Sequence, residues 1–418
     1  MKTLPAQGAT LDGVMAQLRA LQVRDGDYHN ARTWGLIYNA GPDVDEVLRT
    51  AAAHTLLENA LNPFVFPSLK EMQRDIVAMS TGLLHGGVDA GGTVTSGGTE
   101  SIFMAVKTAR DKGRAERGIE RARMVLPYTA HPAFIKAAEL LAVDWVHMPL
   151  GEDLRTRAED LAPLIDDRTV LCVGSAPAYP FGMVDPIPEM SAVAAAARVP
   201  FHVDACLGGF MLPWLEKLGR PVTPWDFRVA GVTSISADIH KYGYGIKGAS
   251  VLLHRPKDNL RHQVFQFGDW PGGTYGSQGF QGTKPAAPIA AAWAVMHYLG
   301  EDGYLRLARQ ALDAADRLIA GVNAIDGLHI WGAPEMTVAA IGSRDRDIMA
   351  VGDGLNARAW HFDRQDKPPA LHLMASPRHA LVVDEFLRDL AEAAATAAPA
   401  SATAPTYGDD VSAEAAGR

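Results

Sequence analysis

Residues 236–248 read Ser-Ala-Asp-Ile-His-Lys-Tyr-Gly-Tyr-Gly-Ile-Lys-Gly, and they place Lys241 between a strand-like run and a glycine-rich loop. An amine held in such a place can be desolvated, because burial and nearby cations both disfavour the ammonium form. The free amine can then attack a carbonyl and form a Schiff base. A solvated loop lysine is the alternative for any single lysine, so the interpretation depends on the surrounding sequence.

Short strand-like runs flank this segment and alternate with helix-like stretches. The strand-like runs cover residues 124–126, 169–173, 201–203, 232–236 and 250–253, and the helix-like stretches cover residues 132–142 and 188–197. Alternation of this kind predicts an α/β fold with a mainly parallel sheet that is covered by helices.

Asp204 follows the apolar run Phe201-His-Val and would stand at the carboxyl end of a strand. Open α/β sheets bind their ligands at that end. A carboxylate there can keep a pyridinium nitrogen protonated, which makes a pyridoxal ring a stronger electron sink. A helix N-cap or a structural ion pair explains an isolated aspartate equally well.

The segment Thr95-Ser-Gly-Gly-Thr-Glu-Ser precedes a helical run over residues 102–109. The first amides of a helix are unpaired and its dipole is positive there, so Gly97, Gly98 and Thr99 could cradle a phosphate. The alternative is a tight strand-to-helix turn with Thr99 as the N-cap. The spacing matches neither the dinucleotide fingerprint nor the P-loop.

His131 lies between a predicted strand and Pro132, which suits the first position of a helix. An imidazole in that loop could lie face-on to an aromatic cofactor ring. A loop histidine with ordinary hydrogen-bond partners is the alternative, and the residue alone does not choose between them.

An N-terminal arm, a second helical pattern and a low-complexity end organise the rest of the chain. Ser68 followed by Glu71 predicts a capping box, and apolar residues at strides of three and four then predict an amphipathic helix ending at Gly86. A second pattern over residues 304–322 predicts a helix leading into a small domain. We expect a helical arm over residues 1–62, a large cofactor-binding domain over 63–303, a smaller domain over 304–393 and a disordered tail over 394–418.

Composition narrows the class of partner. The 418 residues include 48 acidic and 39 basic side chains, which give a net charge of −9 and lack the basic footprint of a nucleic-acid binder. Two cysteines favour a reducing, cytoplasmic compartment over a disulfide framework. Signal-peptide and membrane-spanning patterns are not evident. We expect a small or zwitterionic partner, and no metal.

Five segments, taken in order, resemble the pyridoxal-phosphate lyases of the sphingosine 1-phosphate lyase family, within the group that includes the glutamate and aromatic amino-acid decarboxylases. They are Thr95-Ser-Gly-Gly-Thr-Glu-Ser, His131 with Lys136-Ala-Ala, Gly174-Ser-Ala-Pro-Ala-Tyr-Pro-Phe-Gly-Met-Val-Asp-Pro-Ile, Val203-Asp-Ala-Cys-Leu-Gly-Gly-Phe and Asp238-Ile-His-Lys-Tyr-Gly-Tyr-Gly-Ile-Lys-Gly. The resemblance implies the type I, aspartate aminotransferase-like fold of pyridoxal-phosphate enzymes, with a mainly parallel sheet and a smaller α+β C-terminal domain. It also implies a homodimer with shared sites.

The same resemblance implies roles for individual residues. Lys241 would form the Schiff base with pyridoxal 5'-phosphate, Asp204 would pair with the pyridine nitrogen and His131 would stack on the ring. The remaining cofactor-binding residues would be Gly97, Gly98, Thr99, Ser175, His240, Gly282 and Thr283, of which the last two belong to a loop that reaches the phosphate across the dimer interface. Tyr38, Tyr244 and Lys247 would join Lys241 in catalysis.

Two departures from the family pattern concern the substrate. The family's Asn-Pro-Leu-His reads Asn62-Pro-Phe-Val here, so a histidine is missing. The family's Gly-Ser-Arg-Pro-Gly loop reads Gly282-Thr-Lys-Pro-Ala, which replaces a bidentate guanidinium with the point charge of Lys284. Both changes concern phosphate recognition on the substrate and leave the cofactor residues in place.

The resemblance implies a small-molecule or single-lipid amine as substrate, with retro-aldol cleavage of a phosphorylated long-chain amino alcohol to an aldehyde and phosphoethanolamine. Decarboxylation of an amino acid is the alternative, because the same ring stabilises either carbanion. A third possibility is a binding protein that keeps the cofactor but has lost turnover. The product released from a panel of substrates distinguishes the three.

Overall fold

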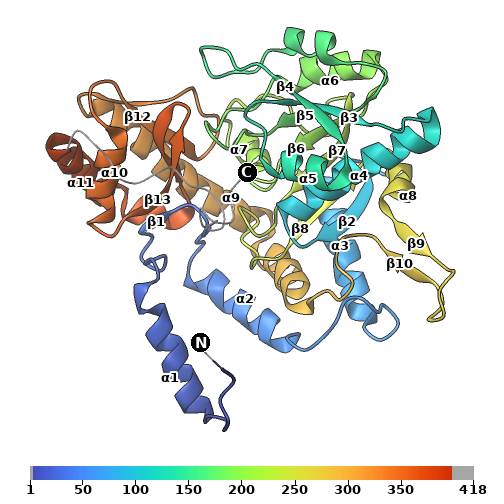
Figure 1. Cartoon of the computed structure of the whole chain (residues 1–418). Helices are drawn as coiled ribbons and strands as arrows, with labels where there is room; N and C mark the ends of the chain where they lie inside the picture. The colour runs from blue at the N-terminus through green and yellow to red at the C-terminus, as the bar shows by residue number, and fades with distance from the viewer. Residues whose placement is uncertain (1–2, 398–418) are drawn as a thin grey trace.

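Two sheets of unequal size and a short hairpin make up the β-structure of the protein. The computed structural model describes residues 3–397, and within them the strands form a seven-stranded sheet, a five-stranded sheet and a two-stranded hairpin (Figure 1). None of the helices in this range has both the length and the apolarity needed to cross a bilayer.

The seven-stranded sheet is mainly parallel, as predicted. In spatial order its strands are β2 (Gly91–Thr95), β8 (Ser250–His254), β7 (Val232–Ala237), β6 (Phe201–Asp204), β5 (Thr169–Ser175), β3 (Arg123–Pro127) and β4 (Asp144–Met148). Only β8 runs against its neighbours. Each predicted strand-like run lies in one of these strands, and β2 and β4 are the two that the sequence did not indicate.

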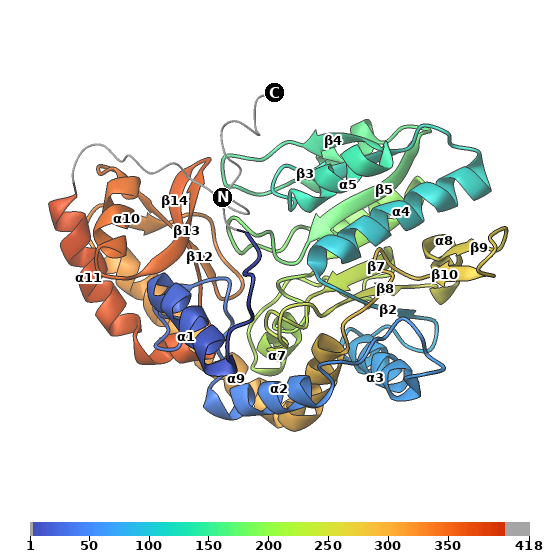
Figure 2. The same cartoon turned by 60° about the horizontal axis from the view of Figure 1, so that its bottom comes forward.

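Helices cover both faces of this sheet because successive side chains along a strand point to opposite sides. On β3, Met124 and Leu126 pack in the apolar cluster that includes α4 and α5, whereas Val125 packs in the cluster that includes α6 and α7. Figure 2 shows α4 lying over the strands. The four helices are α4 (Gly98–Arg117), α5 (Ala133–Leu141), α6 (Ile187–Ala196) and α7 (Leu212–Lys217).

The five-stranded sheet joins the two ends of the described chain. Its order is β1 (Thr33–Trp34), β13 (His361–Asp366), β14 (Pro369–Met374), β12 (Val338–Ser343) and β11 (Leu328–Ile330), and β1 pairs with β13 in parallel while the other pairs are antiparallel. Two helices, α10 (Ile348–Asn356) and α11 (Val383–Thr396), pack with it. The expected disordered tail is wrong at its start, because α11 continues to Thr396 and buries Ala394. Its remainder, residues 398–418, lies outside the described part.

The N-terminal segment carries α1 (Leu11–Leu21), α2 (Pro42–His54) and α3 (Pro67–Leu83). Helix α3 confirms the predicted amphipathic helix, with Leu69 and Ile76 buried. The predicted capping box is wrong, because Phe66 occupies the N-cap, no side chain caps the helix and Ser68 already lies within its first turn. The shorter elements are α8 (Leu260–Gln263), β9 (Phe265–Phe267), β10 (Tyr275–Ser277) and the 3-10 turns η1 (Gln22–Arg24), η2 (Ala158–Asp160), η3 (Ala162–Leu164), η4 (Lys257–Asn259) and η5 (Pro377–Leu381).

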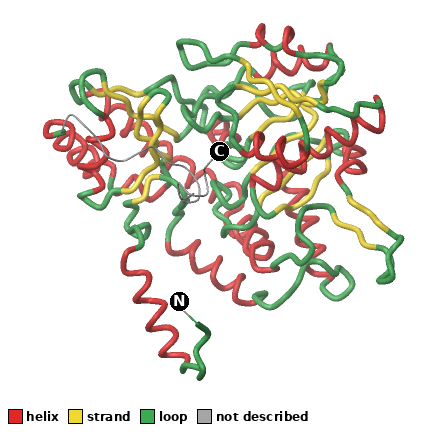
Figure 3. The backbone as a smooth tube through the Cα atoms, in the orientation of Figure 1, coloured by secondary structure: helices red, strands yellow, loops and turns green. Residues whose placement is uncertain are grey.

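One long helix, α9 (Ala286–Ala324), connects the two sheets (Figure 3). It bends at Gly300, whose φ of 53° lies in the left-handed region that favours glycine. Before the bend Ile289 packs in the core of the large sheet, and after it Leu318 packs in the core of the small one. The helix predicted over residues 304–322 is therefore the second part of a longer element.

Candidate active site

One cavity of about 280 Å3 lies at the carboxyl-end edge of the large sheet. Its residues follow β2, β3, β6 and β7, and because these strands run in the same direction their ends meet at one edge. Of the predicted site residues, the structure brings seven together there: Gly97, Gly98, Thr99, His131, Asp204, His240 and Lys241.

The start of α4 forms one wall of the cavity. Its N-cap is Gly97, so no side chain caps the helix and the first amides remain available to an anion. The alternative of Thr99 as the N-cap is therefore wrong. Gly97 has a φ of 154°, and a Cβ on Gly98 would come within 2.8 Å of both Asp238 Oδ2 and Cys206 Sγ. The two glycines let the backbone approach the ligand position closely.

Lys241 lies on the opposite wall, in contact with a buried carboxylate. Its Nζ is 3.1 Å from Asp238 Oδ2, and the same oxygen lies 3.6 Å from His240 Nε2. Burial alone would raise the pKa of Asp238, but Lys241 and His240 outweigh it and lower that pKa. Asp238 thus holds the lysine at the cavity wall.

Asp204 ends β6, as predicted, and a set of buried side chains orients it. Its Oδ1 accepts a hydrogen bond from the Cys206 amide at 3.1 Å and lies 3.4 Å from the Ser236 hydroxyl. The same hydroxyl lies 3.2 Å from Nε2 of His202, a fully buried ring. Both of these Asp204 contacts are made by Oδ1, and neither involves Oδ2.

His131 lies in the loop between β3 and α5. Its Nδ1 accepts a hydrogen bond from the Ala133 amide at 3.1 Å, so in the neutral ring the proton is on Nε2. Burial lowers the pKa of His131, although the Asp204 carboxylate opposes this effect. The ring is therefore neutral near pH 7, which suits a planar group that packs on another ring.

Lys247 and Tyr38 approach each other beside the Lys241 loop. Lys247 Nζ donates to the His240 carbonyl at 3.0 Å and lies 5.2 Å from the centre of the Tyr38 ring. Although Lys247 as a whole is exposed, partial burial of its amine and the nearby Lys241 charge lower its pKa to about 8. The Tyr38 hydroxyl contacts Met374 Sδ at 3.3 Å, so the N-terminal segment and the small sheet both reach this region.

Tyr244, like Lys247 and Tyr38, does not line the cavity. Its φ is 59°, which turns the side chain away from the loop and into the core, where its ring stacks on Tyr304 at 6.1 Å. Burial raises the pKa of Tyr244 well above its usual value. An inaccessible phenol of this kind is a poor group for proton transfer with a substrate.

Ser175, Gly282 and Thr283 also lie outside the cavity wall. Ser175 sits beside Asp204 in the β5–β6 ladder, and its amide donates to Asp185 at 2.7 Å. Gly282 and Thr283 belong to the loop between β10 and α9. Within one chain this loop does not contribute to the 280 Å3 cavity.

Four lining residues were present in the quoted motifs but received no predicted role: Ser96, Glu100, Cys206 and Asp238. Asp238 stands three positions before Lys241, and a carboxylate at that spacing from a candidate amine was the signal available in the sequence. Glu100 gave no such signal, because its partners come from the fold.

The two departures from the family pattern lie in different parts of the structure. Phe64 and Val65, which stand where the family has Leu-His, are 94% and 62% exposed. Lys284 is half-buried, and burial lowers its pKa although the nearby Glu100 carboxylate opposes this. The substitutions therefore lie on the surface and in the β10–α9 loop, away from Lys241 and Asp204.

The residues present fit pyridoxal 5'-phosphate. The Nδ1 atom of His240 is buried and has no hydrogen-bond partner among the described residues, as expected of a group that binds a phosphate or phenolic oxygen. The uncapped α4 and its two glycines supply a phosphate cradle on one side. Asp204 supplies the carboxylate for a protonated ring nitrogen.

Comparisons with known proteins agree with this geometry. The model of the pyridoxal-dependent decarboxylase conserved domain matches residues 46–341. Sphingosine-1-phosphate lyase 1 of Mus musculus is 38% identical over 94% of this chain and 69% of its own length, and sphingosine-1-phosphate lyase of Arabidopsis thaliana is 37% identical over 97% and 77%.

Solved structures show the same fold. The Burkholderia pseudomallei sphingosine-1-phosphate lyase superimposes with a TM-score of 0.91 at 41% identity, covering 95% of this chain and 93% of that one. Glutamate decarboxylase of Lactobacillus brevis, at 20% identity, has a TM-score of 0.80, covers 94% of each chain and shares the fold. The chain has the type I fold, uses pyridoxal phosphate as its cofactor and belongs to the sphingosine-1-phosphate lyase family of carbon–carbon lyases.

Proposed function

We propose that this enzyme cleaves a phosphorylated long-chain amino alcohol of the sphingosine 1-phosphate type to a long-chain aldehyde and phosphoethanolamine. The proposal rests above all on Lys247, an amine with a pKa of about 8 that lies beside the Lys241 loop and is held there by the His240 carbonyl. Cleavage between Cα and Cβ requires removal of a proton from the β-hydroxyl. A lysine that is partly neutral near pH 7.5 can perform that step.

Lys241 and Asp204 prepare the cavity for the amine of the substrate. When bound, the cofactor supplies an electron sink for the pair released from the broken carbon–carbon bond. Lys241 would hold the cofactor, and Asp238 keeps the lysine positioned. Asp204 would keep the ring nitrogen protonated, and His131, which lines the same cavity from the β3–α5 loop, would pack against the ring.

We assign the proton transfers to Lys247 and Tyr38. Neutral Lys247 takes the proton of the β-hydroxyl, the carbonyl of the aldehyde forms, and the Cα–Cβ bond breaks. A proton returned to Cα would then complete the amine product. The Tyr38 ring packs against Lys247, and its hydroxyl is the second candidate group for proton transfer. Tyr244 takes no part because it is buried against Tyr304.

We further propose that the enzyme is a cytoplasmic homodimer in which Gly282 and Thr283 complete the phosphate site across the interface. Large apolar side chains stand exposed around this loop and the segment before α3; they are Leu57, Phe64, Val65, Trp270 and Phe280. Burying such a surface against a second copy removes it from water. The two free, buried cysteines agree with a reducing compartment. Light scattering on the purified protein tests the dimer.

The substrate proposal is tested by the products. Sphingosine 1-phosphate, its unphosphorylated form and a panel of amino acids are each incubated with the enzyme, while aldehyde and carbon dioxide are measured. Release of a long-chain aldehyde only from the phosphorylated amine supports the proposal. Carbon dioxide without aldehyde would establish a decarboxylase instead, and absence of both products with every substrate would leave a cofactor-binding protein.

A further inference from the structure

Glu100 is a buried carboxylate that connects two distant segments of the chain. Its Oε2 accepts a hydrogen bond from the Ser96 amide, and its Oε1 accepts one from the Phe280 amide, both at 2.6 Å. The side chain is only 8% exposed. Ser96 belongs to the phosphate cradle at the start of α4, whereas Phe280 belongs to the β10–α9 loop.

The position of Glu100 in α4 explains why it can bind both segments. With Gly97 as the N-cap, Glu100 is the third residue of the helix, from which a side chain reaches back to the amides before the helix. One oxygen is used there, and the other faces outward to the loop. Because Gly97 has no side chain, the first helical amides stay available to a phosphate while Glu100 stabilises the turn around them.

The β10–α9 loop is held at two points, with Gly282 and Thr283 between them. Glu100 binds the Phe280 amide at one end, and a Cβ on Gly279 would collide with the same carboxylate. At the other end, the Lys284 carbonyl accepts from the Ala60 amide at 2.9 Å. The segment in between is therefore short and fixed at both ends.

We propose that Glu100 is a positioning residue that orders the β10–α9 loop so that Gly282 and Thr283 can close the cofactor phosphate site. The inference rests on the proposed function, in which this loop completes that site across the dimer interface. Glu100 then connects the α4 cradle of its own subunit with the loop that reaches the site across the interface. Although it lines the cavity, its role here is exerted through the loop.

The direction in which cofactor binding changes when Glu100 is neutralised distinguishes a positioning role from a purely electrostatic one. Glu100 carries a negative charge near the place of an anionic phosphate, so by Coulomb's law its neutralisation alone would tighten cofactor binding. If Glu100 acts by positioning, Glu100→Gln does the opposite. The amide keeps one acceptor oxygen but presents N–H groups to the second backbone donor, so one charge-assisted hydrogen bond is lost.

The experiment compares four proteins, each loaded with the cofactor: wild type, Glu100→Gln, Gly279→Ala and the control Glu71→Gln. Glu71 is an exposed residue of α3. Hydrogen exchange of the amides of residues 279–284 reports the order of the loop, and decay of the visible absorbance after dilution reports cofactor release. For Glu100→Gln we expect exchange to rise and release to accelerate by roughly tenfold each, the effect of losing a hydrogen bond to a charged group. Gly279→Ala places a Cβ 2.4 Å from Glu100 Oε1, so it disturbs the same contact from the loop side and should give the same changes, whereas Glu71→Gln should give neither.

Each outcome has one meaning. Unchanged exchange in Glu100→Gln overturns the inference, and so does slower release, which would show that charge dominates. A fifth protein, Thr283→Val, tests the underlying proposal. If its cofactor release equals that of wild type while Glu100→Gln still loosens the loop, the loop does not serve the phosphate and the proposed shared site is wrong.

Discussion

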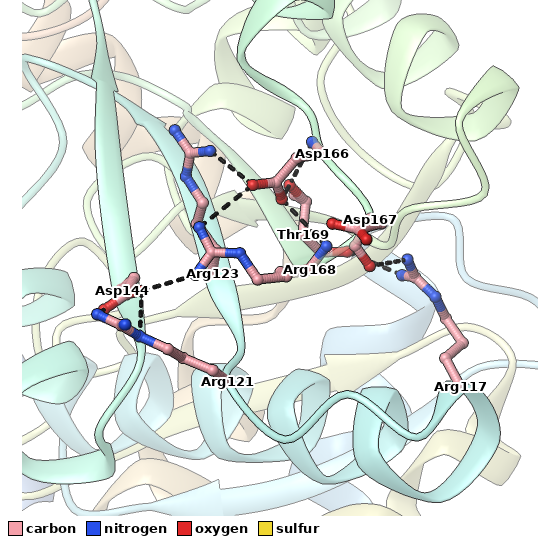
Figure 4. A network of polar contacts seen from close by, with 8 residues as sticks. All are labelled: Arg117, Arg121, Arg123, Asp144, Asp166, Asp167, Arg168 and Thr169. Atoms are coloured by element: carbon pink, nitrogen blue, oxygen red, sulfur yellow. Dashed lines mark hydrogen bonds and ion pairs between the residues drawn. The ribbon is translucent and has the colours of Figure 1, made fainter.

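The two ends of the large sheet carry charged clusters that differ in how their side chains are paired. At the amino ends of β3, β4 and β5, arginines and aspartates bind one another, and Arg117 donates to the Thr169 carbonyl at 2.8 Å (Figure 4). Arg123 lies 2.8 Å from Asp166, and Arg168 lies 3.0 Å from Asp144. At the carboxyl ends, the cluster around Lys241 lines a cavity, and a ring nitrogen of His240 has no hydrogen-bond partner in the described part of the chain.

The difference shows how the same residue types divide between structure and catalysis. In the amino-end cluster burial opposes ionisation, yet Arg123 and the Thr169 hydroxyl lower the pKa of Asp166 to about 2. Asp144 and Asp166 each lie beside arginines, and Arg117 donates to two backbone carbonyls, so these groups satisfy one another. At the carboxyl ends, burial lowers the pKa of both His131 and Lys247, and the fold leaves donors and acceptors that a cofactor can use.

The largest expected effect is that of Lys241→Ala. Without the amine the cofactor cannot be held covalently, so the visible absorbance of the purified protein disappears and lyase activity falls by more than about 10³-fold. The measurement is the absorbance spectrum together with aldehyde release. A visible band that persists in this variant would place the reactive amine elsewhere and remove the distinction between the two clusters.

Asp204→Asn should rank second. The amide can still accept from the Cys206 amide, so the fold should persist, but it cannot stabilise a protonated ring nitrogen. Electrostatic groups of this kind contribute roughly 10²–10³-fold to the rate, and we expect a loss of that size. Steady-state kinetics gives the loss, and thermal unfolding serves as the control. Activity within a few-fold of wild type would show that Asp204 does not face the ring.

The lowered pKa of Lys247 predicts that kcat/KM depends on pH. This pKa of about 8, below the usual value of 10.5, means that the enzyme gains neutral amine as the pH rises toward 8 and that the amine is mostly neutral above it. If Lys247 is the base, kcat/KM rises about tenfold per pH unit well below pH 8 and levels off above it. Lys247→Arg stays charged and should lose the limb near pH 8. An unchanged limb in that variant assigns the titration to another group.

The smallest effect belongs to the amino-end cluster. Asp166→Asn should lower the free energy of unfolding at pH 7 by about 1 kcal/mol or less, because these side chains are partly exposed and screened by solvent. The pKa of Asp166 is depressed in the folded state, so its contribution is present above its unfolded value of 3.8 and is lost as the pH falls through about 2. Urea unfolding at pH 7 and pH 2 measures this. Loss of lyase activity in this variant would contradict the division between the two ends.

Elements with strong local patterns were predictable. The runs that became β5 and β6 are buried along their whole length, as is typical of strands covered on both faces. Strand β2 was not predicted because it begins with Gly91 and Gly92. Strand β4 was not predicted because it lies at the sheet edge with partly exposed side chains. The capping box failed because Pro67, a residue suited to a first turn, begins the helix one position before Ser68.

The candidate site was predictable where sequence position determines spatial position. Asp204 and Lys241 follow strands of one sheet, so their meeting follows from the α/β pattern. Tyr244 could not be placed in this way, since its direction depends on one left-handed φ between two glycines. Glu100 could not be interpreted either, because its partner Phe280 is 180 residues away and only the fold brings them together.

The pairing of β1 with β13 bears on how the protein is made. Thr33 lies opposite His361, so more than three hundred residues must leave the ribosome before the first strand meets its neighbour. Loop closure over such a span is slow compared with local helix formation. The small sheet is therefore completed last during synthesis, and until then Trp34, fully buried in the finished protein, is exposed to chaperones and to other nascent chains.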